Sequence, residues 1–206
     1  GYRGYGSGAL VEDSTYRRNI QGAINAGLRV GVYFYSQAIN EAEAVEEASM
    51  VLSLVSGYSL PLGVYYDTES VSGGRANALS AAERTACAVA FCETIRSAGY
   101  SAGVYSYASW FYNALNFANI SKYNIWIAQY RDKLSFSYKY NIWQYTGSGR
   151  VNGICSGLRP CHHALAERQL VAGRCPIASV AKLLRYLQNQ LFGVAAVVIN
   201  RPIDFE

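Results

Sequence analysis

The chain has 206 residues, the length of one domain of ordinary size. Hydrophobic residues make up 51% of it and charged residues 16%, which supports a sizeable core and excludes a disordered chain. No apolar run reaches the roughly 18 residues that cross a bilayer. The net charge of +4 is too small and too scattered to indicate nucleic-acid binding.

Aromatic residues are the unusual feature of the composition, with eighteen tyrosines and three tryptophans. Their rings combine a stacking face with a polar edge. This combination suits sugar binding, although the same rings also pack ordinary cores.

Strand and helix signals alternate through the first 153 residues. A β-branched and aromatic run at residues 28–35 follows Gly27, which ends the helix expected before it. Asn40, with Glu43 three positions later, has the pattern of a capping box and predicts a helix over residues 41–55. Further strands are expected at residues 62–67, 102–107, 124–129 and 140–145, with helices over residues 80–98 and 110–115 between them.

This alternation predicts βα units and a mostly parallel sheet, either doubly wound or closed into a barrel. The strands at residues 124–129 and 140–145 are separated by about ten residues without a helical pattern. A regular barrel has a helix at that place. The predicted class is therefore α/β, with an irregular architecture at that end.

The composition changes after Ile154. All three tryptophans and seventeen of the eighteen tyrosines precede this point. We therefore expect a domain over residues 1–154 and a divergent tail over residues 155–206. Within the tail an amphipathic helix is expected over residues 177–191, and residues 194–199 have the composition of a buried strand that could cover an exposed sheet edge.

Two carboxylates, Asp67 and Glu69, stand at the end of an expected strand. Two positions apart, they point the same way, about 7 Å from each other along the chain. Barrels and open α/β sheets keep their active sites at such strand ends. Glycosidases commonly break the glycosidic bond with a pair of carboxylates. When two carboxylates lie this close, their like charges raise the pKa of one of them. A solvated strand end or a magnesium site are the alternatives.

Six aromatic side chains fall at or near the carboxyl ends of separate expected strands. In a barrel these ends share one rim, so the rings would line a groove above the two carboxylates. The alternative is that some of them face the helices and belong to the core. The six are Tyr66, Tyr105, Trp126, Tyr130, Trp143 and Tyr145.

Five segments, taken in order, carry a more specific pattern. They read DSTYRRNIQGAINAGLRVGVYFYS, LGVYYDTE, SAGYSAGVYSYASWFYN, YNIWIAQY and YNIWQYTGSGRVNGI. Together they cover the chain from its first residue to about residue 154, and they resemble glycoside hydrolase family 25, the lysozymes (N-acetylmuramidases) of bacteria and phages.

The resemblance implies an irregular, TIM-like β/α barrel, here partial and followed by the divergent tail. It implies hydrolysis of the β-1,4 bond between N-acetylmuramic acid and N-acetylglucosamine in peptidoglycan, without a cofactor or a metal. Glu69 would be the general acid/base. Asp67 would assist the acetamido group of the substrate as internal nucleophile, one of the exceptions to the two-carboxylate scheme.

Two stretches depart from the family pattern. The first strand of the family, with a D-V-S-x-W-Q-like motif, has no counterpart here, since the chain resembles the family from the end of the second strand. Pro160 stands about where the closing strand of the family carries an Asp. The alternative function is therefore that of an inactive barrel fragment that binds peptidoglycan glycan or has no function.

The expected partner is the glycan strand of peptidoglycan, with no nucleic acid and no membrane span, and the protein is expected to be a monomer. The expected location is extracellular or at the cell wall, although the opening residues GYRGYGSG show no signal-peptide pattern.

The five cysteines, an odd number, leave at least one thiol unpaired in a monomer. Cys87 and Cys92 share an expected helix about 140° apart around its axis, so we expect two small core residues rather than a disulfide. The tail holds a further group that lacks the close C-x-x-C spacing of structural zinc sites, and no metal site is expected there. That group is Cys155, Cys161, His162, His163 and Cys175.

Overall fold

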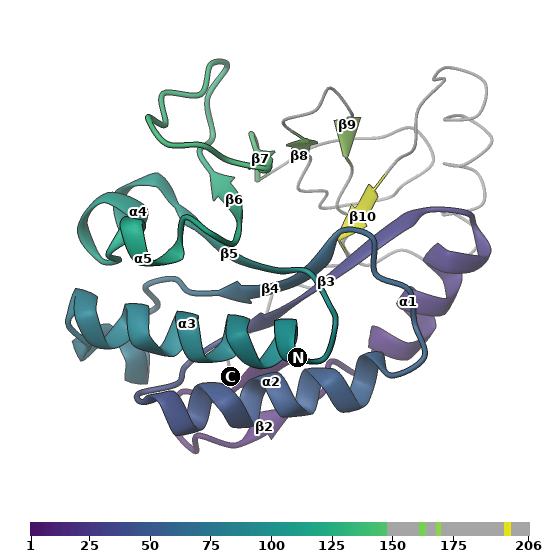
Figure 1. Cartoon of the computed structure of the whole chain (residues 1–206), viewed down its shortest axis with the longest axis horizontal. Helices are drawn as coiled ribbons and strands as arrows, with labels where there is room; N and C mark the ends of the chain where they lie inside the picture. The colour runs from purple at the N-terminus through teal and green to yellow at the C-terminus, as the bar shows by residue number, and fades with distance from the viewer. Residues whose placement is uncertain (148–160, 164–167, 170–195, 199–206) are drawn as a thin grey trace.

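The computed structural model describes residues 1–147, 161–163, 168–169 and 196–198. One sheet runs through them in the strand order β2-β1-β3-β4-β5-β6-β7-β8-β9, and β10 pairs with β3 off this path (Figure 1). The strands are β1 (Tyr2–Arg3), β2 (Leu10–Val11), β3 (Arg29–Tyr35), β4 (Gly63–Asp67), β5 (Ala102–Tyr107), β6 (Asn124–Ala128), β7 (Ile142–Gln144), β8 (Cys161–His163), β9 (Arg168–Gln169) and β10 (Ala196–Val198). The helices are α1 (Tyr16–Asn25), α2 (Glu41–Val55), the 3-10 helix η1 (Arg75–Ala78), α3 (Ala81–Ser97), α4 (Ala108–Asn113) and α5 (Phe117–Ile120).

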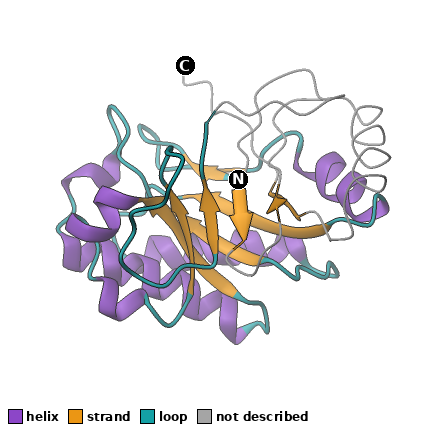
Figure 2. Cartoon of the chain, turned by 90° about the horizontal axis from the view of Figure 1, so that it is seen from above, coloured by secondary structure: helices purple, strands orange, loops and turns teal. Residues whose placement is uncertain are grey.

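The central strands β3 to β7 are all parallel, and β8 and β9 continue the sheet in antiparallel orientation. Helices α2 and α3 cover one face of the parallel strands, and Figure 2 shows the strands fanned across the middle of the molecule. In the described residues no ladder joins β9 to β10 or to β2, so the sheet forms an open, partial barrel. The predicted α/β class with a mostly parallel sheet is confirmed.

The long helices begin where the sequence predicts. The side-chain oxygen of Asn40 accepts a hydrogen bond from the backbone N–H of Glu43 at 2.9 Å, and α2 spans the expected residues 41–55. Before α3, the hydroxyl of Ser80 accepts from the backbone N–H of Glu83, whose carboxylate accepts in return from the backbone N–H of Ser80. Both caps satisfy backbone donors that a helix start leaves without partners.

Side chains that alternate along the strands form two separate cores. The larger core lies between the sheet and the helices and includes Val64 and Tyr66 of β4. The smaller core covers the opposite, inner face and consists mainly of aromatic rings around Trp126. Tyr65 belongs to this inner core, so Asp67, two positions on, lies on the inner face as well.

The backbone at the start of β4 requires glycine. Gly63 has φ +84°, a conformation that side chains with a Cβ rarely adopt. A Cβ there would lie 2.6 Å from the carbonyl oxygen of Ser101, which accepts the hydrogen bond of Val64 N–H at 2.8 Å. The close approach sets the register between β4 and β5.

Part of the tail pairs with the edge of the sheet. Residues 196–198, within the predicted strand at residues 194–199, form β10 in parallel register with residues 29–31 of β3. The predicted edge-covering strand is therefore present over these residues. The predicted helix at residues 177–191 and the boundary at residue 154 lie outside the described residues.

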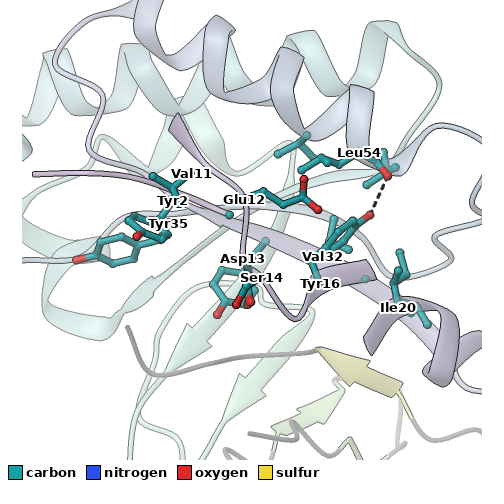
Figure 3. Close-up of a pocket in the computed structure, with 16 residues that line it drawn as sticks. Tyr2, Val11, Glu12, Asp13, Ser14, Tyr16, Ile20, Val32, Tyr35 and Leu54 are labelled. Carbon is teal, nitrogen blue, oxygen red and sulfur yellow. Dashed lines mark hydrogen bonds between the residues drawn. The ribbon is translucent and has the colours of Figure 1, made fainter. Parts of the chain in front are cut away.

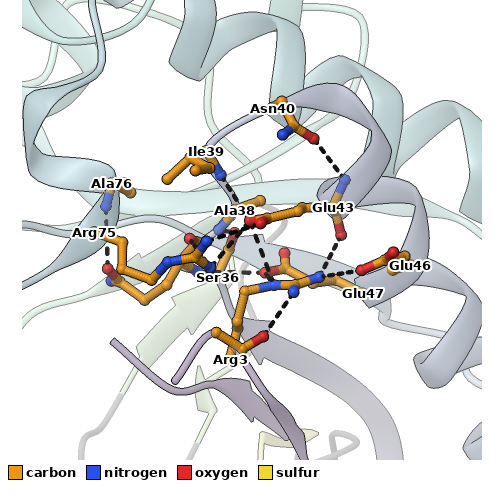
Figure 4. A network of polar contacts seen from close by, with 12 residues as sticks. Arg3, Ser36, Ala38, Ile39, Asn40, Glu43, Glu46, Glu47, Arg75 and Ala76 are labelled. Atoms are coloured by element: carbon orange, nitrogen blue, oxygen red, sulfur yellow. Dashed lines mark hydrogen bonds and ion pairs between the residues drawn. The ribbon is translucent and has the colours of Figure 1, made fainter. Parts of the chain in front are cut away.

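A network of buried charges fastens β1 to α2 (Figure 4). The guanidinium of Arg3 donates to the carboxylate of Glu47 at 2.9 Å, and the two side chains are 5% and 0% exposed. Beside them, Arg75 pairs with Glu43 at 2.8 Å. Burial raises the pKa of Glu47 to about 7, and hydrogen bonds from Ser36 and Arg3 offset part of that effect.

Among the helices of the described residues, none is both long enough and apolar enough to cross a membrane.

Candidate functional site

The candidate site lies at the carboxyl end of β4. Asp67 is the last residue of this strand and stands in register between Tyr35 of β3 and Tyr105 of β5. Its carbonyl oxygen accepts the backbone N–H of Ser36 at 2.9 Å, and Thr68 N–H donates to the Tyr105 carbonyl at 3.1 Å. These bonds tie the strand end to both neighbouring strands.

One further bond fixes the chain just before Glu69. The hydroxyl of Ser106 donates to the carbonyl oxygen of Thr68 at 2.6 Å, and Ser106 is fully buried. The backbone just before Glu69 is therefore held in place by β5.

The two carboxylates differ in their access to solvent. Asp67 is buried, with 5% of its surface exposed, whereas Glu69 is half-buried and lines a groove. Burial raises the pKa of Tyr35, and the negative charges of Asp67 and Glu69 raise it further. The pKa of Tyr107 is also raised, first by burial and then by the charge of Glu69. Both carboxylates thus lie within electrostatic reach of Tyr35, with Glu69 placed toward Tyr107.

The groove has a volume of about 550 Å³ and is formed by the end of β5, by α4 and by the loop after β6. We call it the Glu69 groove. The side chains that matter for its chemistry are Glu69, Tyr105, Tyr107, Tyr112, Tyr130 and Arg131.

The structure brings only two of the six predicted aromatic side chains into this groove, Tyr105 and Tyr130. Trp126 lies below them in the inner core, 3% exposed, with its ring centre 4.6 Å from that of Tyr105. Tyr145 is half-buried, 5.9 Å from the ring of Trp143. Trp126 and Tyr145 are not among the described side chains that line the groove.

Tyr66 and Trp143 were expected in the groove, but neither is among the described residues that line it. Tyr66 points to the helix side of the sheet, where its ring lies 5.2 Å from that of Phe91 in α3. Trp143 packs against the same core and donates from its indole nitrogen to the Gln129 carbonyl at 2.8 Å. The physical reason is alternation, because each of these residues neighbours an inward-facing residue along its strand.

Gln144 is a site residue that the sequence analysis missed. Its side-chain oxygen accepts hydrogen bonds from the hydroxyls of Tyr105 at 2.9 Å and Tyr130 at 3.1 Å. It is 1% exposed. The alternation of side chains along the strand could have revealed Gln144. Ile142 faces inward, and a residue two positions later faces the same way.

A second cavity of about 330 Å³ lies between β3, α1 and α2 (Figure 3). Its wall combines apolar side chains with Glu12 and Asp13, and the hydroxyl of Tyr16 closes one side by donating to the Leu54 carbonyl at 3.0 Å. Neither Asp67 nor Glu69 is among the described residues that line it. We therefore take the Glu69 groove as the candidate site.

Within the described residues, no group of three or more His, Cys, Asp or Glu side chains is placed to hold a metal ion. Cys87 and Cys92 are buried and form no disulfide, as predicted. Burial raises the pKa of the Cys87 thiol to about 11 and that of Cys92 further, so both remain unreactive thiols near neutral pH. The side chains of the predicted tail group lie outside the described residues.

Carboxylates at the end of a parallel strand, beside a tyrosine-lined groove, are an arrangement that glycoside hydrolases use. The family model for glycosyl hydrolases family 25 matches residues 6–154. The chain therefore belongs to glycosyl hydrolase family 25, and the resemblance seen in the sequence is confirmed.

Individual relatives agree with this assignment. The autolytic lysozyme of Clostridium acetobutylicum is 32% identical over 148 residues, which are 71% of this chain and 43% of that protein. The modular autolysin LytC of Streptococcus pneumoniae, solved in complex with a synthetic peptidoglycan ligand, is 28% identical with a TM-score of 0.66 over 76% of this chain and 37% of that one. The chain thus spans less than half the length of these two relatives.

A family 25 glycosyl hydrolase from Bacillus anthracis, at 23% identity and a TM-score of 0.60, covers 72% of this chain and 66% of that one and shares the fold. The predicted TIM-like architecture is therefore confirmed, with the sheet open in the described part of the chain.

Proposed function

We propose that the protein is a lysozyme that hydrolyses the β-1,4 bond between N-acetylmuramic acid and N-acetylglucosamine in peptidoglycan. Membership of family 25 and the likeness to an autolytic lysozyme support this proposal. The observation that carries it is the pair at the end of β4, with Glu69 in a groove and Asp67 buried on the same face.

In this proposal Glu69 is the general acid/base. Its half-buried carboxyl lines the groove, where a glycosidic oxygen can reach it. A general acid at this position donates its proton in the transition state, which requires the carboxyl group to reach the glycosidic oxygen. The proton passes to the leaving oxygen, and the carboxylate later takes a proton from the attacking water.

Asp67 acts on the substrate rather than on water. The acetamido oxygen of the muramyl residue attacks the anomeric carbon as the glycosidic bond breaks, and the buried Asp67 carboxylate stabilises the positive charge that develops on the acetamido group. Water then opens this intermediate with overall retention of configuration. The backbone bonds on both sides of Asp67 support the role, because they fix the position of the strand end that carries it.

The sugar rings are held by the tyrosines of the groove. Tyr105 and Tyr130 carry this role from the sequence analysis, and Tyr107 and Tyr112 line the same groove. A pyranose ring presents C–H groups that pack on the exposed rings of Tyr112 and Tyr130, while Tyr105, 4% exposed, shares the acceptor Gln144 with Tyr130 beneath them. We propose no such contact for Tyr66 or Trp143, which pack in the other core.

The proposal needs no cofactor and takes the protein as a monomer acting outside the cell or at the cell wall. The alternative is a domain that binds glycan without cleaving it. The presence of both Asp67 and Glu69 at one strand end favours cleavage.

The test is to incubate the chain with purified cell walls and identify the new reducing ends. A lysozyme of this type releases fragments that end in N-acetylmuramic acid. New ends in N-acetylglucosamine would contradict the assigned bond. Binding to the walls without any new reducing ends would support the glycan-binding alternative.

A further inference from the structure

The exposed tyrosines of the described chain gather on one side of the molecule. Tyr112, Tyr130 and Tyr138 are 41%, 53% and 41% exposed, whereas the other large hydrophobic side chains that are exposed, Ile39 and Val45, lie at the start of α2. Tyr112 and Tyr130 line the Glu69 groove. Tyr138 lies outside the groove, with its ring centre 5.5 Å from that of Tyr112.

Tyr112 and Tyr138 are held in place rather than free to turn. The hydroxyl of Tyr112 accepts the backbone N–H of Ser137 at 2.8 Å, which ties α4 to the loop between β6 and β7 (Figure 1). The ring of Tyr138 stacks on Phe117 of α5 at 3.9 Å with an interplanar angle of 11°. Phe136, 9% exposed, packs beneath both tyrosines. Rings fixed in this way lose little conformational freedom when a ligand stacks on them.

The same loop carries exposed positive charges. Arg131, Lys133 and Lys139 face solvent together with a single acid, Asp132. None of the three cations forms an ion pair with a residue that the structure describes. The loop therefore presents a net positive charge around the two rings and is available to an anionic ligand.

We propose that Tyr112 and Tyr138, which we call the tyrosine platform, form an accessory binding surface for a glycan strand that leaves the Glu69 groove, and that the cations of the loop select strands bearing carboxylates. This inference rests on the proposed function. Sugar rings stack on the exposed tyrosine faces. The lysines attract the carboxylates of the muramyl groups and their peptides, which a neutral polymer such as chitin lacks.

Because the tyrosine platform adjoins the Glu69 groove, we take a glycan as the ligand of the platform. Tyr112 belongs both to the groove wall and to the platform, so the groove that holds Glu69 and the ring of Tyr138 adjoin at this residue. A protein partner would meet two tyrosines surrounded by charge, a small apolar area for a stable interface.

The experiment measures binding of the full chain to insoluble peptidoglycan and to chitin in a Glu69→Gln background, which prevents turnover. Tyr138→Ala weakens binding to both polymers by about twofold to tenfold, and Tyr138→Phe keeps it, because stacking needs the ring alone. Lys133→Gln with Lys139→Gln weakens binding to peptidoglycan alone and reduces its dependence on salt. Val45→Ala, an exposed apolar side chain on α2, is the matched control and leaves binding unchanged.

A second measurement does not depend on the stability of a variant. Nitration of exposed tyrosines in the unsubstituted chain, mapped by mass spectrometry, slows at Tyr138 when soluble peptidoglycan fragments are present. Binding of Tyr138→Ala equal to that of the control, or nitration of Tyr138 unaffected by the fragments, would overturn the platform. If cell walls are not cleaved but Tyr138-dependent binding persists, the proposed activity fails and the platform stands.

Discussion

The hydroxyl of Tyr105 donates a 2.9 Å hydrogen bond to the side-chain oxygen of Gln144, a residue 39 positions further along the chain. Tyr130 donates to the same oxygen at 3.1 Å. One buried amide on β7 therefore orients two groove tyrosines that come from β5 and from the loop after β6.

Replacement of Gln144 tests this arrangement. Gln144→Met keeps most of the side-chain volume but leaves the buried Tyr105 hydroxyl without its acceptor, so we expect a loss of about 1–3 kcal/mol in the free energy of unfolding, measured by urea denaturation. Combining it with Tyr105→Phe restores much of this loss, because both ends of the bond are then apolar. Losses that simply add in the double variant would show that the bond is not the cause.

Glu69→Gln removes the proposed general acid. We expect the rate of cell-wall lysis, followed by turbidity, to fall at least about a hundredfold. The melting temperature should stay the same because Glu69 is half-buried at the end of the sheet. Glu41→Gln, an exposed acid at the start of α2, is the control and retains the rate. A Glu69→Gln variant as active as this control would place the chemistry elsewhere.

The ion pair between Arg3 and Glu47 is the basis of a stability prediction. At a pH above about 7, where Glu47 is ionised, Arg3→Met leaves its carboxylate buried without its partner, and we expect the free energy of unfolding to drop by about 3–5 kcal/mol. The matched control is Arg17→Met, which breaks the exposed pair with Glu12 and changes stability little. Adding Glu47→Met to Arg3→Met should recover most of the loss, and a double variant as unstable as Arg3→Met alone would contradict this account.

The Glu47 carboxyl group also predicts that the free energy of unfolding depends on pH. Burial raises the pKa of Glu47 from 4.5 to about 7, so the folded state holds this proton more tightly than the unfolded state does. The stabilising contribution is complete below about pH 4.5 and is lost as the pH rises to about 7. Urea denaturation across this range should show the decline, and Glu47→Gln should flatten it. A slope unchanged by Glu47→Gln would assign the dependence to other groups.

Gly63→Ala should destabilise the start of β4. The new methyl group meets the Ser101 carbonyl at 2.6 Å in a backbone with φ +84°, and we expect a cost of about 1–3 kcal/mol or more. Gly57→Ala is a useful comparison, because its φ of +83° imposes the same backbone strain while no atom lies within 4 Å of the added Cβ. Equal melting temperatures for the two variants would rule out the contact with Ser101 as a cause.

Local signals predicted much of the fold. The Asn40 and Ser80 caps, the glycine stops and the β-branched runs act through neighbouring residues, and the elements they mark appear within a few positions of the prediction. The partner of Gln144 could not be predicted in this way. Its bond to Tyr105 depends on how β5, β6 and β7 lie side by side.

The face of the sheet on which each side chain near a strand end lies was predicted less well. Asp67 and Glu69 came from their spacing at the end of one expected strand; β4 ends at Asp67, and the shared catalytic role of the two stays a prediction. Tyr66 and Trp143 were assigned to the rim by their place along the strand, without regard to which face they occupy. Tyr138 was not singled out, because its neighbour Phe117 is distant in sequence and contacts it only through the folding of the loop.

The inner face of the sheet is filled by the ring of Trp126, which lies 5.5 Å from Tyr65 and 6.1 Å from Tyr33. In the described part of the chain, the groove that holds Glu69 lies at the strand ends, so a polymer reaches Glu69 by lying across these ends from the solvent side. A surface of this kind can bind a glycan at internal positions and does not require a free end of the glycan strand. Under the proposed function, cross-linked wall material would then be cut at internal bonds, with long fragments released from the first encounters onward and single disaccharides only late.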